Sequence, residues 1–333
     1  MSILSPFEKL EAYENENTAH IIDVLRRKQQ NDYSAGSTRR DAHPKHTGLL
    51  RAKFTVESNL PAEYRVGLFS EAQSYEAWVR FSNASGQAQS DAIKDVRGCA
   101  IKLLGVSGAK IPESDEHDSQ DFLLISTPTM PLGTLQLFHD AIYLSTDWSP
   151  HLFLAKLIFT GRFGLLKEMG AARTCPPCPS TIRYWSTTPY LFGSNRAAKY
   201  SIIPTSAYEA PLPGELTESY LSDALERHLN ESDATYDFMV QLSSDPKLMP
   251  VEDASVPWDE AQSPFVKVAS LHIPMQQFRT AERDELSEGL AFSPAHARME
   301  HRPIGAINRG RIRIYTEQAK YRQRRDQRER VQW

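Results

Sequence analysis

Cysteines are few and long apolar runs are missing, and each absence excludes a class of protein. The three cysteines, Cys99, Cys175 and Cys178, are too few for the disulfide framework of a small secreted domain, and their number is odd. No uninterrupted apolar run approaches the ~20 residues that cross a bilayer. The N-terminal segment has acidic residues where a signal peptide needs a basic start and an apolar stretch. We therefore expect a cytoplasmic protein with no transmembrane segment.

A strong charge of one sign is also missing. The 333 residues include 38 basic and 42 acidic side chains, which gives a formal net charge of −4 at pH 7. No global field therefore attracts nucleic acid or an anionic membrane. With 40% hydrophobic and 24% charged residues, the composition is that of an ordinary soluble globular protein. We expect small molecules as partners, and no nucleic acid.

Several common motifs are absent or incomplete. The glycines form neither GxGxxG nor GxxxxGK[ST], so a nucleotide-phosphate cradle is unsupported, and no G-x-S-x-G elbow indicates an esterase. Cys175 and Cys178 form a lone CxxC without a second pair, whereas a structural zinc site needs about four ligands. A loop staple or two plain thiols explains this pair better than a metal site does.

Short runs with alternating apolar residues dominate the chain from Leu49 onward. Glycine, serine, asparagine and proline separate these runs, which is typical of short β-strands. No βαβ alternation is present, so we predict an α+β fold with an antiparallel sheet or barrel. The runs are LLRAKFTVES, VGLFS, YEAWVRFSN, CAIKLLGV, DFLLIST, RYWSTTPY, KYSIIP, YDFMVQLS and FVKVASLHIP.

Three other segments have helical patterns. Residues 1 to about 40 place apolar side chains at helical spacing and end in a polar run, which predicts an arm laid on a core. Residues 134–170 also fit helices, and their part 152–166 is strongly apolar. Both a buried helix and a lipid-facing or substrate-channel helix are consistent with that part. The chain from residue 310 to 333 is predicted to be a helix that is basic in its second half.

Three places in the chain hold the residues best suited to chemistry. Residues 40–48 (RDAHPKHTG) precede the first strand, where a histidine is ordinarily a surface or hydrogen-bonded residue. Residues 80–83 (RFSN) are followed by 95–98 (DVRG), and an arginine inside an apolar strand needs an anion to justify its burial. Residues 310–315 (GRIRIY) begin the last predicted helix.

The spacing in the last of these segments suggests a mechanism. Arg311 and Tyr315 are four residues apart, so they share one face of a helix and the guanidinium can donate to the phenol oxygen. A nearby cation favours the phenolate, and a tyrosine phenolate is one of the axial ligands of haem iron. Arg322 is two helical turns further on and falls on the same face, where it can pair with a carboxylate. An ordinary packing pair of arginine and tyrosine is the simpler alternative.

In this order the segments resemble the haem catalases, and more closely the short catalase-like proteins that include haem peroxidases and allene oxide synthase domains. Residues 40–45 are similar to the catalase distal-histidine segment, 95–98 to its Asp-x-Arg-Gly, and 310–315 to its Gly-Arg-x-x-x-Tyr proximal motif. Arg322 falls where that family keeps a haem-contacting arginine. The likeness to the short members lies in residues 184–204, 237–258 and 292–311.

The resemblance implies a fold and a division of the chain. The expected fold is a catalase-like antiparallel β-barrel core with surrounding helices and a C-terminal helix that carries the proximal tyrosine. Residues 1–39 would form the N-terminal helical arm, residues 40–325 the haem-binding domain, and residues 326–333 a basic C-terminal tail.

The resemblance also implies roles for individual residues. Tyr315 would be the proximal ligand of the iron in haem b, and Arg311 would keep it ionised. His43 would be the distal acid–base group because Arg40 precedes it at the family's spacing, although His46 is a rival for that role. The haem propionates would be neutralised by Arg40, Arg97 and Arg322.

Two departures from the family pattern bear on activity. Catalases have a distal asparagine shortly before a proline and a pair of phenylalanines, whereas residues 121–130 (DFLLISTPTM) have neither. Ser126 or Thr127 could supply a weaker distal hydrogen bond. The chain is also far shorter than a full catalase, so we expect no bound NADPH.

These expectations define a leading function and three alternatives. The leading one is a haem peroxidase that acts on hydrogen peroxide or on organic hydroperoxides, fatty-acid hydroperoxides among them, with a reductant that the sequence does not identify. A true catalase, a hydroperoxide isomerase or dehydratase of the allene oxide synthase kind, and a non-catalytic haem-binding protein stay open. The resemblance is also compatible with a homo-oligomer.

Overall fold

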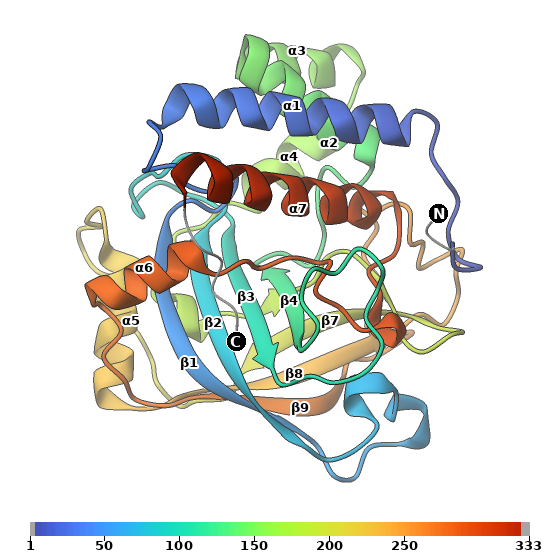
Figure 1. The fold of residues 1–333 in the computed structure, drawn as a ribbon, viewed down its shortest axis with the longest axis vertical. Helices are drawn as coiled ribbons and strands as arrows, with labels where there is room; N and C mark the ends of the chain where they lie inside the picture. The colour runs from blue at the N-terminus through green and yellow to red at the C-terminus, as the bar shows by residue number, and fades with distance from the viewer. Residues whose placement is uncertain (1–3, 328–333) are drawn as a thin grey trace.

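A β-barrel forms the centre of the molecule in the computed structural model, which describes residues 4–327 (Figure 1). Nine strands of this part form one antiparallel sheet, and the pairing of β5 with β7 closes eight of them into a ring. β6 (Tyr190–Leu191) adds to β7 outside that ring. In order around the barrel the strands are β1 (His46–Val56), β2 (Ser74–Asn83), β3 (Arg97–Leu104), β4 (Ser119–Ile125), β5 (Tyr184–Trp185), β7 (Ala197–Pro204), β8 (Ala234–Leu242) and β9 (Val266–Ile273).

Aromatic side chains fill the barrel interior. Phe54, Phe122 and Phe238 come from three different strands, and their ring centroids lie 4.7 to 6.3 Å apart. All three are fully buried, as expected for the inward positions of strands whose side chains alternate between the two faces. The predicted α+β class and antiparallel barrel are therefore confirmed.

One run that was predicted to be a strand is a short helix instead. Residues 67–69, within VGLFS, form a 3₁₀ turn that begins at Gly67 with a φ of +53°. Its backbone is held from outside the sheet, because the Leu68 amide donates to Nε2 of the buried His301 over 3.0 Å. Leu68 and Phe69 are buried by this turn, so their apolar character reflects core packing and not strand pairing.

Helices cover one end and one side of the barrel. The helices predicted in residues 134–170 are confirmed, and we call this group the cap: α2 (Leu135–Tyr143), a π-helical turn (Leu144–Trp148), α3 (Pro150–Phe159) and α4 (Phe163–Ala171). Thr134 and Ser149 begin α2 and α3 by accepting hydrogen bonds from the amides of Leu137 and His151. No helix within residues 4–327 is long and apolar enough to cross a membrane. The remaining helices are α1 (Glu14–Asp32), α5 (Tyr220–Glu231), α6 (Ala281–Gly289) and α7 (Ala306–Asp326).

The first and last helices run parallel to each other across the end of the barrel (Figure 1). α7 begins at Ala306, four residues before the predicted start, and ends at Asp326. The last six residues of the predicted helix, 328–333, lie outside the described part of the chain. Apolar residues of α1, α2 and α7 form one small core, and the Gln318 side chain donates to the Ile22 carbonyl over 2.9 Å.

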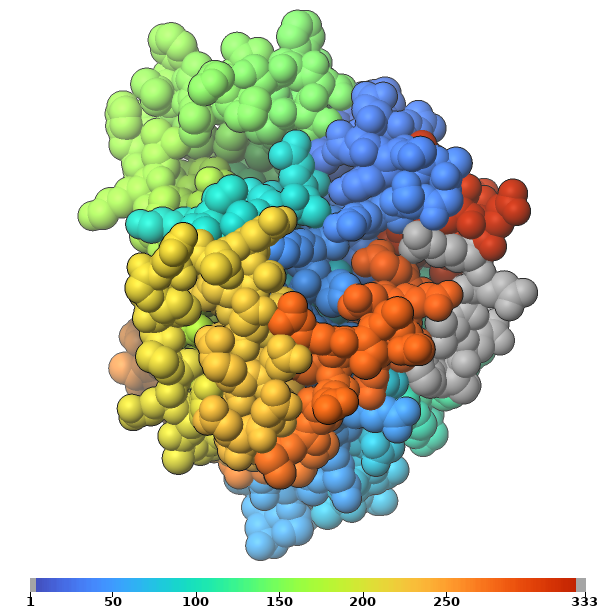
Figure 2. All heavy atoms as spheres, turned by 90° about the vertical axis from the view of Figure 1, so that its left-hand side faces the viewer, coloured from blue at the N-terminus to red at the C-terminus, as the bar shows by residue number. Residues whose placement is uncertain are grey.

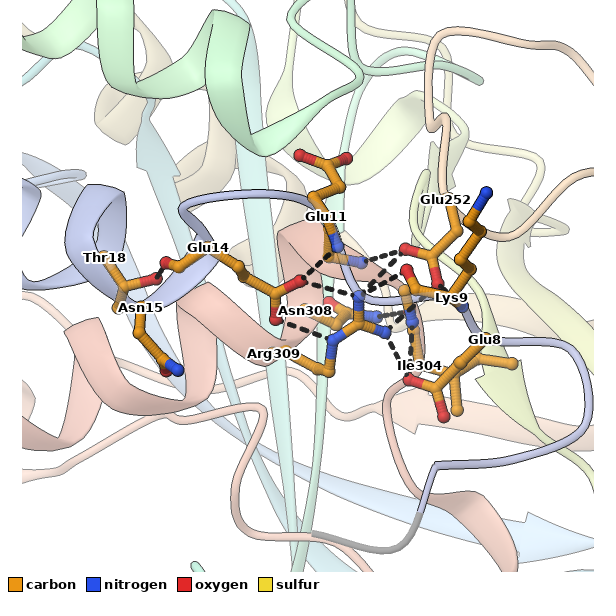
Figure 3. Close-up of polar contacts among 12 residues, drawn as sticks. Glu8, Lys9, Glu11, Glu14, Asn15, Thr18, Glu252, Ile304, Asn308 and Arg309 are labelled. Atoms are coloured by element: carbon orange, nitrogen blue, oxygen red, sulfur yellow. Dashed lines mark hydrogen bonds and ion pairs between the residues drawn. The ribbon is translucent and has the colours of Figure 1, made fainter. Parts of the chain in front are cut away.

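The start of α7 is fixed by carboxylates from distant parts of the chain (Figure 3). Arg309 contacts Glu8 and Glu14 over 2.7 Å each, and Glu252 over 3.1 Å. Glu8 also accepts from the Gly305 amide, and Glu252 from the Ala306 amide, which places negative charge at the positive end of the helix. These contacts anchor the helix and the N-terminal segment to each other.

Gly305 sets the direction in which the chain enters α7. Its φ is +88°, and a Cβ at this position would lie 2.1 Å from the Val251 carbonyl oxygen. Gly36 has the same φ of +88°, but a Cβ there would meet no atom within 4 Å. A comparison of alanine substitutions at these two positions therefore separates the cost of backbone strain from the cost of steric overlap.

We expect Gly305→Ala to lower the free energy of unfolding by about 3 kcal/mol or more, because overlap with the backbone adds to strain. Gly36→Ala should cost only about 1 kcal/mol, from the unfavourable φ alone. Urea denaturation of both variants measures the difference. Equal losses would show that α7 does not depend on the close approach at Gly305.

Candidate functional site

A cavity of about 750 Å³ lies between one end of the barrel, α1, α7 and the cap. The strands β2, β3 and β4 contribute its floor, α7 contributes one wall, and α2 with α3 contributes another. The N-terminal arm takes part as well, through Leu25 and Lys28. Much of the lining is apolar, including Leu123, Leu124, Phe138, Ile142, Phe153 and Ile314.

Helix α7 presents three of the predicted site residues to this cavity. Arg311, Tyr315 and Arg322 all line it, as their spacing on one helical face predicts. The guanidinium carbon of Arg311 lies 5.4 Å from the centroid of the Tyr315 ring. Burial alone would lower the pKa of Arg311, but the phenol groups of Tyr315 and Tyr190 raise it above its ordinary value. The arginine is thus a permanent cation beside the tyrosine.

His43 lines the same cavity and is held in an unusual backbone conformation. Its φ is +56°, a region that non-glycine residues rarely occupy and that is concentrated at functional sites. Its Nδ1 lies 2.9 Å from the Ser82 hydroxyl, and its carbonyl accepts from Arg80 over 2.9 Å. A Cβ on Gly98 would lie 2.6 Å from the same Nδ1, so the ring packs directly on the backbone of β3.

The surroundings of His43 oppose its protonation. Burial, followed by the positive charges of Arg80, Arg311 and Arg40, lowers the pKa of His43 to about 3. The imidazole is therefore neutral at physiological pH, and one ring nitrogen is available to accept a proton.

Three arginines of the cavity lining gather around Glu288. Arg40, Arg80 and Arg322 line the cavity, and Arg40 donates to the carbonyls of residues 287 and 290 over 2.7 and 2.6 Å. Burial, with Arg40 close by, lowers the pKa of Arg80, and Glu288 partly opposes this. Burial raises the pKa of the neighbouring Asp41, and the charges of Arg322 and Arg40 oppose this. Glu288 lies 3.5 Å from Arg40. Burial alone would raise the pKa of Glu288, but the three arginines lower it, so the three guanidinium groups share this carboxylate.

Arg97 is placed elsewhere, which corrects its predicted role. Its side chain is fully buried, donates to Asn83 Oδ1, and also donates to the carbonyls of Asp91, Ile93 and Thr174 over 2.8 to 3.2 Å. It does not line the cavity. Arg97 thus ties loops to the end of β3, and Arg80 stands in the cavity wall instead.

Ser126 and Thr127, the candidates for a distal hydrogen bond, lie outside the cavity lining. The Ser126 hydroxyl accepts from the Arg97 amide over 2.9 Å, and Thr127 donates to the Thr129 carbonyl over 2.9 Å. The arrangement therefore does not support a distal hydrogen bond from either hydroxyl. His46 contacts Asp284 over 3.0 Å and is not part of the cavity wall, so the structure favours His43 over this rival.

Two site residues were not assigned a role from the sequence. Arg80 and Ser82 alternate on β2, so they share the face of the strand that points to the cavity. The sequence does place an arginine inside an apolar strand. Only the tertiary structure shows that Arg80, and not Arg97, faces the cavity.

A second polar cluster borders the cavity without forming a metal site. Glu116, Asp121 and His296 lie close enough together to hold an ion. The fully buried Lys102 ammonium lies 2.5, 2.9 and 3.1 Å from these three groups, so it already supplies the cation. The three cysteines are free thiols, and Cys99 lines the cavity with its pKa raised by burial.

Comparisons with known proteins place this arrangement in a fold. No protein-family model and no curated protein sequence matches the chain. Among solved structures, the chain is similar to a fungal catalase (TM-score 0.63, 15% identity), to catalase A from Saccharomyces cerevisiae (0.69, 14%) and to a bacterial catalase (0.67, 15%). Each alignment covers 97% of this chain and 66%, 67% and 63% of the three catalases, respectively. The chain therefore has the catalase-like fold and spans about two thirds of the length of those structures.

The neutral state of His43 can be tested directly. We expect its imidazole to stay neutral from about pH 8 down to about pH 5, whereas an unperturbed histidine titrates near 6.5. Carbon-detected NMR of histidine-labelled protein reports this, and His43→Gln identifies the resonance. A midpoint above about pH 6 would contradict the surroundings described here.

Proposed function

We propose that the chain is a haem-dependent oxidoreductase that acts on hydrogen peroxide or on an organic hydroperoxide. The observation that carries this proposal is that one cavity is lined by Tyr315, by its partner Arg311 and by the neutral His43. The catalase-like fold supports it, since proteins of that fold with 14–15% identity include the three catalases above.

The cavity residues fit haem b by their chemistry. Tyr315 would be the proximal ligand of the iron, with Arg311 stabilising the phenolate. The cations of Arg40, Arg80 and Arg322 suit the two propionates, because three guanidinium groups outnumber the Glu288 carboxylate that they share. The apolar lining suits the macrocycle. When bound, haem supplies the redox chemistry toward peroxide.

His43 would carry a proton within the peroxide. In the tautomer whose Nδ1 donates to the Ser82 hydroxyl, Nε2 is unprotonated and can take the proton from one peroxide oxygen. The same nitrogen can return the proton to the other oxygen, which then leaves as water or as an alcohol. The left-handed backbone of residue 43 and its bond from Arg80 would hold the ring in place for both transfers.

A peroxidase or an isomerase is favoured over an efficient catalase. Within residues 121–130, the stretch matched to the distal asparagine segment, the cavity is lined by apolar side chains alone: Leu123, Leu124, Ile125 and Met130. No amide from this stretch therefore assists His43. We propose that residues 40–325 form the haem-binding domain, with the arm of residues 1–39 closing the cavity through Leu25 and Lys28.

We expect His43→Gln to lower kcat/KM for peroxide by about 10²-fold or more, because a general acid–base contributes 10²–10⁴-fold. His46→Gln is the matched control and should leave kcat/KM within about twofold, since His46 lies outside the cavity. Both variants are assayed after reconstitution with haem and after confirming equal haem content.

The products distinguish the kinds of activity. Oxidation of an added electron donor indicates a peroxidase, and consumption of a fatty-acid hydroperoxide without a donor indicates an isomerase. Rapid oxygen release from hydrogen peroxide would instead indicate a true catalase. Stoichiometric haem without turnover of any of these would contradict the enzymatic proposal and leave a haem-binding protein.

A further inference from the structure

The cap exposes several large apolar side chains, which we call the outer apolar cluster, within residues 148–163. Phe159 is 90% exposed, Trp148 66% and Phe163 61%. Leu152, Leu154 and Ile158 of α3 are exposed beside them in the sequence. Soluble proteins rarely leave so many apolar residues of one short segment in water without a partner. In Figure 2 the cap is the green lobe at the top of the molecule, next to α1.

Helix α3 is apolar on all its sides. Phe153 and Leu157 are buried against the rest of the cap, whereas Leu154 and Ile158, one residue further along, face outward. Lys156 is its single charged residue. A helix that is hydrophobic all round is ordinarily enclosed by protein or lipid. We therefore expect a partner or lipid to cover the outer side of α3.

The charges of the cap differ from those of the whole chain. The cap has three cations, Lys156, Arg162 and Lys167, and all three are exposed, although Lys156 pairs with Asp140 of α2 over 2.6 Å. Its other anions are Asp147, which pairs with Arg27 over 2.5 Å, and Glu168. No anion lies between residues 148 and 167, so the stretch with the exposed apolar residues is positive, whereas the whole chain has a formal charge of −4.

The combination of exposed aromatic and basic side chains indicates what covers this surface of the cap. Lysine is depleted at the apolar centre of protein–protein interfaces, so lysines among exposed phenylalanines argue against a second copy of the chain. Trp or Phe beside Lys and Arg is typical of segments that lie in the interface of an anionic bilayer. We propose that the cap docks the protein on an anionic lipid surface through Trp148, Phe159 and Phe163, with Arg162 and Lys167 at the headgroups.

The position of the cap relates docking to the cavity. Phe153, Met169 and Arg173 of this region line the cavity, while their neighbours form the outer apolar cluster. Docking would therefore bring the cavity close to the lipid. The entry of an apolar hydroperoxide from the lipid depends on the proposed function, whereas the docking itself does not.

Sedimentation of the full chain with vesicles tests the proposal. We expect binding to phosphatidylcholine vesicles that contain phosphatidylglycerol, and weaker binding when salt is added or when phosphatidylglycerol is omitted. Phe159→Ser with Phe163→Ser should lower the partition constant by about tenfold or more, because two large apolar contacts are lost. Leu212→Ser with Leu248→Ser is the matched control, since both leucines are 55% exposed outside the cap.

Three outcomes would overturn the proposal. These are no binding to either vesicle, equal loss in the two double variants, or a dimer of the wild-type chain that the cap variant converts to monomers. Haem content and peroxide turnover in solution should be unchanged in the cap variant, because Phe159 and Phe163 do not line the cavity. Failure of docking is thereby distinguished from failure of the haem proposal.

Discussion

The ion-pair cluster around Arg309 determines where helix α7 lies along its axis, and the rest of the site depends on that position. Glu8, Glu14 and Glu252 hold the first turn from three directions (Figure 3). A shift of one helical turn moves every α7 side chain by about 5.4 Å, which would take Tyr315 out of the cavity. Because the anions come from the N-terminal segment and from a distant loop, the site is complete only when both ends of the chain are folded.

The barrel supplies the second half of the site. His43 precedes β1, but its ring is oriented by Ser82 on β2 and packs on Gly98 of β3, and Arg80 holds its carbonyl. Burial and then the cations that line the cavity keep this histidine neutral. The same cations would suit the propionates of the proposed haem.

The sequence was sufficient for the barrel strands, the helical cap and the face of α7, because each follows a short periodic pattern. It did not distinguish Arg80 from Arg97, since both are arginines in apolar strands and only the closed barrel shows which of them faces the cavity. Helix α5 was not predicted, although Leu221, Ala224 and Leu225 have helical spacing. The apolar stretch of the cap was compatible with burial or exposure, and the structure shows both, on opposite sides of α3.

Binding of haem through Tyr315 is tested most directly by the ultraviolet–visible spectrum of the chain produced with a supply of haem. We expect one haem per chain and a Soret band with phenolate charge-transfer features that change in Tyr315→Phe. Tyr321→Phe is the matched control, because Tyr321 lies on the same helix but outside the cavity lining. Absence of stoichiometric haem in the wild type, or identical spectra in wild type and Tyr315→Phe, would contradict the assignment of the cavity.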